Sequence, residues 1–339
     1  MNPNRAETEM YSKTRILIAT IIVLILTATG YFIYQRYVMP KASSVEFVFA
    51  YQDRVADLAS IVAVKLGYFK DEGLKGIRTM MFHSGPACVE ALVYGKADFG
   101  TMGDTTAILI AASKQPLKII ATHGGGENRH RIIAKYGSGI RSIKDLVGKK
   151  IAVKKGTSTH GGLMLLAKKY GLDIDPYLID LDPSSQLTAL ASGAVDAIVA
   201  SEPTPSIAEY KKYGYEVATL GGLNNTYPIL LVVRSEFAER HPEVVVKVLR
   251  ALIRASRFIH ENPAEAAGIL ANITGIPVEA VMKAMKYHYY NVTMDPRTVN
   301  SLESMAKFLR DIGKIEETPD FRRVIDTSYL KEAYRELGS

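Results

Sequence analysis

Two stretches of the chain decide the predicted fold: ALVYGKADFGTMGD at residues 91–104 and ALASGAVDAIVASE at residues 189–202. Both stretches carry Ala-Leu, then Gly, then Asp at the same spacing, and both end on an acidic residue, Asp104 or Glu202. Each copy predicts a helix that ends near Gly, a short buried strand, an acidic loop and the start of another helix. Two copies of such a unit predict two similarly built lobes.

The sequence around these stretches alternates apolar runs with helical segments that are punctuated by Gly. Strands are predicted at residues 45–50, 77–82, 131–135, 151–153, 177–181 and 197–200. This alternation is typical of α/β domains, each with a mostly parallel sheet flanked by helices. From Ser235 onward the pattern becomes helical, and a proline opens each new segment, at Pro242, Pro263, Pro277 and Pro296.

Length and composition predict an ordinary globular protein. The chain has 339 residues, of which 47% are hydrophobic and 23% are charged, so two domains are expected. The net charge is +7, but Lys and Arg are interspersed with Asp and Glu, which argues against a nucleic-acid partner. A single cysteine, Cys88, excludes an intramolecular disulfide.

An apolar run near the N-terminus predicts a membrane segment. Residues 16–34 read ILIATIIVLILTATGYFIY, and no charged residue occurs between Arg15 and Arg36. As a helix this run would span about 28 Å, close to the hydrocarbon thickness of a bilayer. We predict a transmembrane anchor or signal at residues 16–36, with the uncleaved anchor favoured, after a terminal segment 1–15 and before a linker 37–44. Basic residues before the run favour a body outside the cytoplasm.

The sequence carries none of the catalytic or metal-binding motifs that we sought. GxxxxGK[ST], GxSxG, HExxH and the DxDxDG calcium loop are all absent, and the His residues show no metal-ligand spacing. Cys88 could act as a nucleophile with His83, His123 or His160 as its base. A small apolar residue in the first turn of a helix is the simpler interpretation of Cys88. The sequence therefore predicts no enzyme, no metal and no cofactor.

Four predicted loops between strand and helix are rich in Gly and hydroxyl residues. They occupy residues 52–53, 84–86, 103–105 and 155–160. Helix N-termini present free N–H groups and a partial positive charge, which suit anionic oxygens. Because ligands bind at the carboxyl ends of strands in α/β sheets, we expect these loops to meet at one ligand site.

Four segments, taken in chain order, resemble a known family: SGP at 84–86, GKADFGTMGD at 95–104, IRSIKDLVGKKIAVKKGTSTH at 140–160 and SGAVDAIVASEP at 192–203. From about residue 47 to 213 the chain is similar to the nitrate-, sulfonate- and taurine-type substrate-binding proteins of ABC importers. The resemblance implies a type II periplasmic-binding-protein fold, in which the chain crosses twice between two lobes. The first lobe is expected at residues 45–128 and 229–339, and the second at residues 129–228.

The resemblance also implies which residues contact the ligand. In the first lobe they are Gln52, Ser84, Gly85, Gly103 and Asp104. In the second lobe they are Thr157, Ser158, Thr159, His160 and Glu202. Asp53, beside Gln52, and Tyr227, near the second crossing, complete the predicted site.

The predicted site departs from the family pattern at Ser201, where members often have Trp, and this chain contains no Trp. Either Tyr227 or Tyr51 replaces that aromatic wall, or the ligand differs. Three acidic residues would repel a bare anion, namely Asp53, Asp104 and Glu202. A solute with an anionic and an amino end, such as taurine, would satisfy both the donors and the carboxylates.

The resemblance implies a solute receptor without catalytic activity. The solute would bridge the two lobes, and the closed form would dock on a membrane permease with its ATPase subunit. The receptor would work in the periplasm or outside the cell, held by its N-terminal helix. Two alternatives stay open: an enzyme or a pyrimidine-precursor binding or synthesising protein on the same fold, and a sensor that signals through a partner.

Overall fold

The structure is a computed structural model that describes Thr27 and residues 45–338. Among these residues, no helix is both long enough and apolar enough to cross a membrane. The predicted anchor at 16–36 lies outside the described residues except for Thr27, and the predicted segment 1–15 and linker 37–44 lie wholly outside them.

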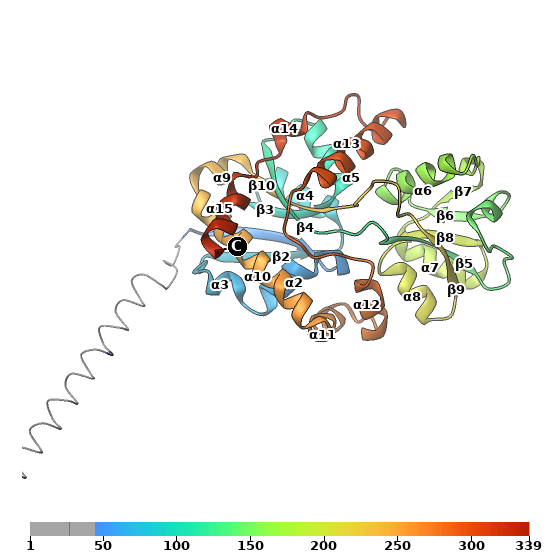
Figure 1. Cartoon of the computed structure of the whole chain (residues 1–339), viewed down its shortest axis with the longest axis horizontal. Helices are drawn as coiled ribbons and strands as arrows, with labels where there is room; N and C mark the ends of the chain where they lie inside the picture. The colour runs from blue at the N-terminus through green and yellow to red at the C-terminus, as the bar shows by residue number, and fades with distance from the viewer. Residues whose placement is uncertain (1–26, 28–44, 339) are drawn as a thin grey trace, which may run out of the picture. The chain divides into compact units, whose positions relative to one another are not determined.

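Residues 45–338 form two lobes, and each lobe is built on a five-stranded sheet (Figure 1). The first sheet has the strand order β2-β1-β3-β10-β4, with β1 Phe47–Gln52, β2 Ile77–Phe82, β3 Phe99–Gly103, β4 Leu117–Gly124 and β10 Ile229–Arg234. The second has the order β7-β6-β8-β5-β9, with β5 His130–Lys135, β6 Ile151–Val153, β7 Leu178–Asp180, β8 Ala197–Ser201 and β9 Gly214–Thr219.

Both sheets are mixed, which corrects the prediction of mostly parallel sheets. In the first sheet, β10 lies between β3 and β4 and pairs antiparallel with both. In the second, β5 lies between β8 and β9 and pairs antiparallel with both. The remaining pairs are parallel, as predicted. Each inserted strand follows a crossing from the other lobe, so it enters its sheet from the opposite end.

Helices cover the sheets of both lobes (Figure 1). The first lobe carries α2 Leu58–Lys65, α3 Tyr68–Asp71, α4 Gly85–Val93 and α5 Asp104–Ala112, and the second carries α6 Ser158–Lys169, α7 Pro183–Ser192 and α8 Thr204–Tyr210. The C-terminal helices are α9 Ser235–Arg240, α10 Pro242–Glu261, α11 Pro263–Thr274, α12 Val278–Met285, α13 Pro296–Asp311, α14 Phe321–Val324 and α15 Ser328–Leu337. Within residues 45–338, three short 3₁₀ helices lie at Val55–Asp57, Ile143–Leu146 and Asp175–Tyr177. The four prolines predicted to open helical segments stand at, or directly before, the first residue of α10, α11, α12 and α13.

The internal repeat predicted from the sequence is confirmed in the structure. The Asp98 N–H donates to the Val48 carbonyl near the start of β1, and the Asp98 Oδ2 accepts from the Val48 N–H, both at 2.9 Å. Asp196 makes the equivalent contacts with Lys150 at the start of β6, with its Oδ2 2.8 Å from the Lys150 nitrogen. The helix before each Asp ends in a turn with a left-handed Gly, at Gly95 (φ +66°) and Gly193 (φ +78°). The two aspartates therefore fix the same strand-to-strand junction in both lobes.

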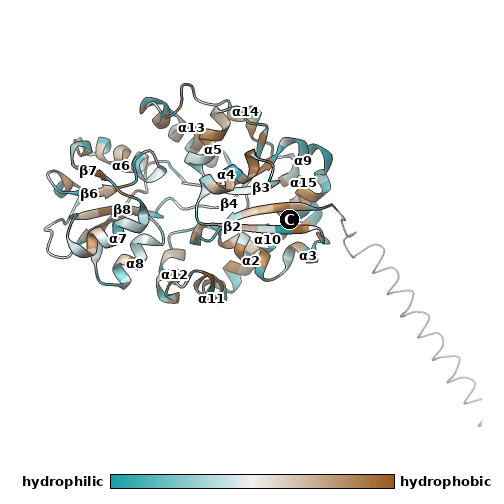
Figure 2. Cartoon of the chain, turned by 180° about the vertical axis from the view of Figure 1, so that it is seen from behind, coloured by the Kyte–Doolittle hydropathy of each residue, from teal (hydrophilic) through white to brown (hydrophobic). Residues whose placement is uncertain are grey.

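Apolar residues concentrate on the strands and on the inner faces of the helices (Figure 2). The 20-residue helix α10 packs along α2 and α15, and its buried face carries a regular series of aliphatic residues that includes Val244, Val248, Leu249, Leu252 and Ile259. This 3.6-residue spacing gives α10 a continuous apolar face, with which the helix packs in the first lobe. The first lobe is therefore built from both ends of the described chain.

Three chain segments run side by side where the lobes meet. The chain leaves β4 at Gly124 and enters β5 at His130, and it returns between the end of β9 and Ile229. The residues after α12 form the third segment, in which Tyr289 exchanges two backbone hydrogen bonds with Gly125. A Cβ atom on Gly126 would lie only 2.1 Å from the Tyr287 carbonyl oxygen, so the close approach of these segments requires glycine there.

A buried arginine organises the charges of the second lobe next to the crossings. Arg131, on β5, is 0% exposed. Its guanidinium contacts the carboxylate of Glu202 at 2.6 Å, that of Glu216 at 2.6 Å and that of Glu209. Because a buried ionic group is costly unless it is fully paired, the three carboxylates and Arg131 depend on one another.

The C-terminal segment contacts this charge cluster from the first-lobe side. The ring of Tyr287 covers Arg131 at 4.2 Å, and its hydroxyl donates to Glu216 at 2.9 Å. Lys283, on α12, pairs with Glu209 at 2.9 Å. Helix α12 packs against α11 of the first lobe and against α8 of the second, so the cluster connects the two lobes.

We expect the substitution Arg131→Met to lower the free energy of unfolding by about 3–5 kcal/mol, because it leaves the buried carboxylate of Glu202 without its charged partner. Urea unfolding of the full chain in detergent measures this change. Arg310→Met, which removes an exposed arginine paired only with its neighbour Asp311, is the matched control and should change stability by less than about 0.5 kcal/mol. Equal effects of the two substitutions would show that the Arg131 cluster does not stabilise the fold.

Candidate ligand-binding site

A cavity of about 390 Å³ lies where the loops of the two lobes face each other. The first lobe contributes the loops after β1, β2 and β3, and the second contributes the loops after β6, β7 and β8. All six loops follow the carboxyl ends of strands, which is where ligands bind in open α/β sheets. The strand-to-helix loops predicted from the sequence therefore meet in one place.

Eight of the twelve predicted site residues line this cavity. They are Gln52, Ser84, Gly85 and Gly103 from the first lobe and Thr157, Ser158, Thr159 and Glu202 from the second. The other four, Asp53, Asp104, His160 and Tyr227, do not line it. Contact of any of these residues with a ligand stays a prediction.

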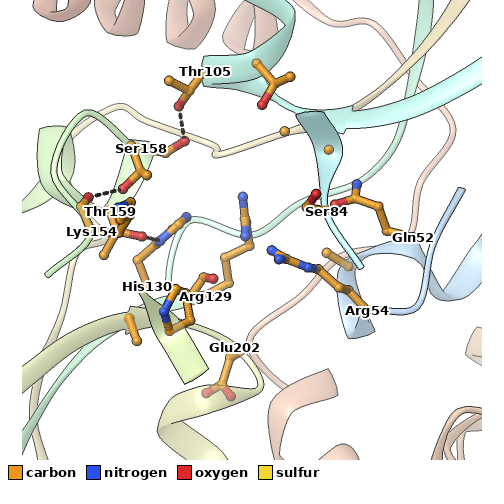
Figure 3. Close-up of a pocket in the computed structure, with 18 of the residues that line it drawn as sticks. Gln52, Arg54, Ser84, Thr105, Arg129, His130, Lys154, Ser158, Thr159 and Glu202 are labelled. Carbon is orange, nitrogen blue, oxygen red and sulfur yellow. Dashed lines mark hydrogen bonds between the residues drawn. The ribbon is translucent and has the colours of Figure 1, made fainter. Parts of the chain in front are cut away.

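Asp104 connects the two lobes beside the cavity. It begins α5 in the first lobe, and its Oδ1 accepts hydrogen bonds from the Thr105 N–H at 2.8 Å and from the Ser158 hydroxyl of the second lobe. The Ser158 and Thr105 hydroxyls also lie 2.6 Å apart (Figure 3). The N-termini of α5 and α6 are thus joined directly, and Asp104 is a contact between lobes.

The aromatic wall expected from Tyr227 or Tyr51 is not part of the cavity lining. Tyr227 is buried behind His130, with ring centroids 4.3 Å apart, and its hydroxyl donates to the Leu220 carbonyl. Tyr51 is buried in the core of the first lobe. Among the described residues, the ring of His130 is the one aromatic ring that lines the cavity.

Two histidines lie at the second-lobe side of the cavity. The Nδ1 atom of His130 lies 2.6 Å from the Thr159 hydroxyl, and burial lowers the pKa of His130 well below its usual value, so the ring is neutral. His160 accepts from the Gly156 N–H and packs against Phe308 on α13, with ring centroids 5.5 Å apart.

Each of the three carboxylates expected to repel an anion has partners within the protein. The Glu202 oxygens accept from Arg131 and from the Ser206 N–H. Asp53 lies 2.5 Å from Nδ1 of His83, and Asp104 accepts from Ser158 and Thr105. Arg131 therefore compensates the charge of Glu202, whereas Asp104 is held by neutral donors and its Oδ2 has no hydrogen-bond partner among the described residues. Burial raises the pKa of Asp104, which disfavours its charged form.

A buried arginine that the sequence analysis missed lies in the cavity. Arg129 precedes β5 and is 5% exposed, and its Nε donates to the Tyr227 carbonyl at 3.0 Å. No carboxylate of residues 45–338 forms an ion pair with its guanidinium. Burial lowers the pKa of Arg129, and the nearby Asp104 acts in the opposite direction. The group nevertheless stays charged at neutral pH, so the cavity contains a cation that forms no direct ion pair with a described carboxylate.

Two further cations line the cavity. Arg54, in the loop after β1, donates from Nε and Nη2 to the His83 carbonyl, and Figure 3 shows its guanidinium and that of Arg129 pointing into the middle of the cavity. Lys154 lies at the second-lobe side and pairs with Asp182 at 3.2 Å. The cavity is therefore electropositive around Arg129 and Arg54.

A buried carboxyl group lies below the first-lobe wall of the cavity. Asp57 is 0% exposed, and its oxygens accept from the Thr101 hydroxyl and from Nε2 of Gln52 at 3.2 Å. His123 lies 3.9 Å from Asp57, and neither of its ring nitrogens has a hydrogen-bond partner among the described residues. Burial raises the pKa of Asp57 to about 7 and lowers that of His123 to about 4.

We expect Asp57 to make stability depend on pH in a way that Asp57→Asn removes. Between about pH 4 and pH 7 the folded protein retains the Asp57 proton that the unfolded chain has lost, so the free energy of unfolding falls as pH rises through this window and levels off above pH 7. The slope is at most about 1.4 kcal/mol per pH unit. Urea unfolding of the wild type and of Asp57→Asn at pH 5, 6, 7 and 8 measures the difference between their free energies of unfolding. Because both proteins contain His123, the contribution of its titration largely cancels from this difference. A constant difference across this range would contradict the expectation.

Comparisons with known proteins agree with this arrangement. The family described as NMT1/THI5 like matches residues 58–266. The putative aliphatic sulfonates-binding protein of Bacillus subtilis strain 168 is 30% identical over 286 residues, which cover 82% of this chain and 86% of that protein. The taurine-binding periplasmic protein of Escherichia coli K12 is 25% identical over 307 residues, which cover 86% of this chain and 94% of that protein.

Among solved structures, the periplasmic aliphatic sulphonate binding protein SsuA of Escherichia coli superposes on this chain with a TM-score of 0.76. The superposition covers 84% of this chain and 92% of SsuA at 21% sequence identity. This likeness shows that the described residues adopt the two-lobed periplasmic-binding-protein fold.

Proposed function

The chain belongs to the NMT1/THI5-like family, and on this premise we propose that it is the solute receptor of an ABC importer for small organic anions of the sulfonate class. Its named relatives bind aliphatic sulfonates or taurine. The receptor makes and breaks no bonds. It captures a solute between its lobes and presents the closed form to a permease whose ATPase subunit supplies the energy.

The observation that carries this proposal is that the buried guanidinium of Arg129 forms no direct ion pair with a described carboxylate. Burying a guanidinium away from water costs several kcal/mol unless an anion pairs with it. No carboxylate of the described residues fills that role, whereas the other buried arginine, Arg131, has three. An anionic solute in the cavity would complete the pair and offset the cost.

The lobes supply complementary donors to such an anion. Ser84 and Gly85 begin α4 in the first lobe, and Thr157 and Ser158 begin α6 in the second. Backbone N–H groups at these helix N-termini favour anionic oxygens. Because the donors come from both lobes, a solute that contacts all of them holds the lobes together, which is the basis of ligand-driven closure.

The enzyme alternative finds little support in the candidate nucleophile. Cys88 lies in α4, is wholly buried and does not line the cavity. Burial raises the pKa of the Cys88 thiol to about 12, so the reactive thiolate is scarce at neutral pH. A receptor needs no such group.

We also propose that the two lobes work outside the cytoplasmic membrane, held there by the apolar run at residues 16–34. Two relatives are periplasmic by name. The length of the run and the basic residues before it support an uncleaved anchor with this orientation.

Isothermal titration calorimetry of the full chain in detergent tests the receptor function against ethanesulfonate, taurine, isethionate, nitrate, phosphate and succinate. We expect at least one sulfonate to bind, and Arg129→Gln to weaken its binding by about 100-fold or more, because the partner of the anion is lost. The same substitution should leave the melting temperature of the ligand-free protein unchanged or higher, since it removes an unpaired buried charge.

Arg310→Gln, at an exposed arginine distant in sequence from the cavity loops, is the matched control and should bind as the wild type does. If no compound binds, or if a compound is chemically converted, the receptor proposal is wrong. Undiminished binding by Arg129→Gln would remove the observation on which the proposal rests.

A further inference from the structure

Gln52 is held in one orientation at the end of β1. Its side chain is 3% exposed, and its amide nitrogen donates to Oδ2 of Asp57 at 3.2 Å and to the Thr101 carbonyl at 3.3 Å. An amide nitrogen carries two hydrogens, so both of its donors are used. If the amide group were rotated by 180°, the Gln52 oxygen would face the Thr101 carbonyl oxygen. Both atoms are acceptors at every pH, so this orientation is excluded.

The side-chain oxygen of Gln52 therefore faces the other way. It lies 3.7 Å from the position that a Cβ atom on Gly85 would take, and Gly85 lines the cavity. Figure 3 shows Gln52 beside Ser84 at the first-lobe wall. No described residue donates a hydrogen bond to this oxygen, so it presents an acceptor without a donor.

A second glutamine repeats this arrangement in the other lobe. Gln186, on α7, is 1% exposed and lines the cavity. Its amide nitrogen donates to the Leu181 carbonyl at 2.9 Å, and its buried oxygen has no hydrogen-bond partner among the described residues. Each lobe thus contributes one glutamine whose nitrogen is bound to the backbone and whose oxygen is not paired.

The cavity consequently contains two kinds of unsatisfied group. Arg129 and Arg54 offer donors and positive charge, and the two glutamines offer acceptors. When a ligand displaces water from the cavity, a buried acceptor that is left without a donor weakens the binding free energy. An acceptor that pairs with the ligand does not. A ligand that satisfies the whole cavity must therefore contain both an anionic group and a hydrogen-bond donor.

We infer that the solute carries an ammonium or hydroxyl group in addition to its anionic group, and that Oε1 of Gln52 accepts a hydrogen bond from it. Aminoalkanesulfonates and hydroxyalkanesulfonates fit this description. Unsubstituted alkanesulfonates and nitrate leave the acceptor unpaired. The inference rests on the proposed receptor function and narrows its substrate class. Of the three carboxylates expected to bind an amino group, Glu202 alone lines the cavity, and its oxygens accept from Arg131 and Ser206, so the glutamines provide the acceptors there instead.

The test compares three sulfonates of equal size on the full chain in detergent by isothermal titration calorimetry. Taurine carries an ammonium, isethionate a hydroxyl and propane-1-sulfonate a methyl group at the same position. We expect taurine or isethionate to bind about tenfold or more tightly than propane-1-sulfonate, because only they pair the Gln52 oxygen.

Gln52→Met removes the acceptor and keeps the length of the side chain. We expect it to reduce the preference for taurine or isethionate toward equal binding, mainly by weakening those two ligands, while propane-1-sulfonate binds at least as well as before. Gln115→Met, at an exposed glutamine of the first lobe, is the matched control and should keep the wild-type preference.

The outcomes separate the inference from the receptor function. If propane-1-sulfonate binds the wild type as tightly as both donor-bearing ligands, the inference is wrong and the receptor function stands. A preference that persists unchanged in Gln52→Met would also overturn it, because the donor would then reach another group. If none of the three sulfonates binds the wild type, the proposed function itself fails. The comparison of ligands on the wild type decides the inference even if Gln52→Met does not fold.

Discussion

The insertion of one strand into each sheet from the opposite lobe is the constraint on which the site depends. β5 and β10 each follow a crossing, and each is fixed between two neighbouring strands. Arg129 is the last residue before β5, and its carbonyl accepts a hydrogen bond from the Glu202 N–H at 2.8 Å. The sheet ladder thus holds the crossing segment, and with it the buried cation, at the junction of the two lobes. The Tyr227 carbonyl in the second crossing then fixes the guanidinium itself.

The distribution of charge around the cavity follows from which groups are paired inside the protein. The acidic side chains are bound by protein donors: Glu202 by Arg131, Asp53 by His83, and Asp104 by Ser158 and Thr105. The cations Arg129 and Arg54 are held by backbone carbonyls, which fix their positions without cancelling their charge. This difference produces an electropositive cavity in a region that is rich in acidic residues. A count of charged residues along the loops gives the opposite impression, because it does not include the pairing.

The sequence was sufficient to predict the local elements of the fold and part of the site. β2 and β6 have the predicted bounds, the prolines open the C-terminal helices, and the two Asp residues of the repeat occupy equivalent junctions. These features depend on local periodicity and turn chemistry, which a sequence displays directly. β4, β9 and β10 were not predicted, and the antiparallel insertions that make both sheets mixed were also missed, because strand order is a tertiary property. Arg129 was missed because nothing in the sequence around an arginine states that it is buried. A charged residue directly before a strand at a predicted lobe crossing was the one available signal.

The repeated junctions at Asp98 and Asp196 have a consequence for how a solute is oriented. Two copies of one building block face each other across the cavity, so both of its sides present helix N-termini, those of α4 and α5 in the first lobe and of α6 and α7 in the second. Helix N-termini on both sides do not by themselves distinguish the two orientations in which a small solute can be bound. The side chains that differ between the copies, Arg54 and Asp57 in one lobe and Lys154 in the other, break this pseudosymmetry. The orientation in which a solute is bound is therefore set by the few positions at which the two lobes differ.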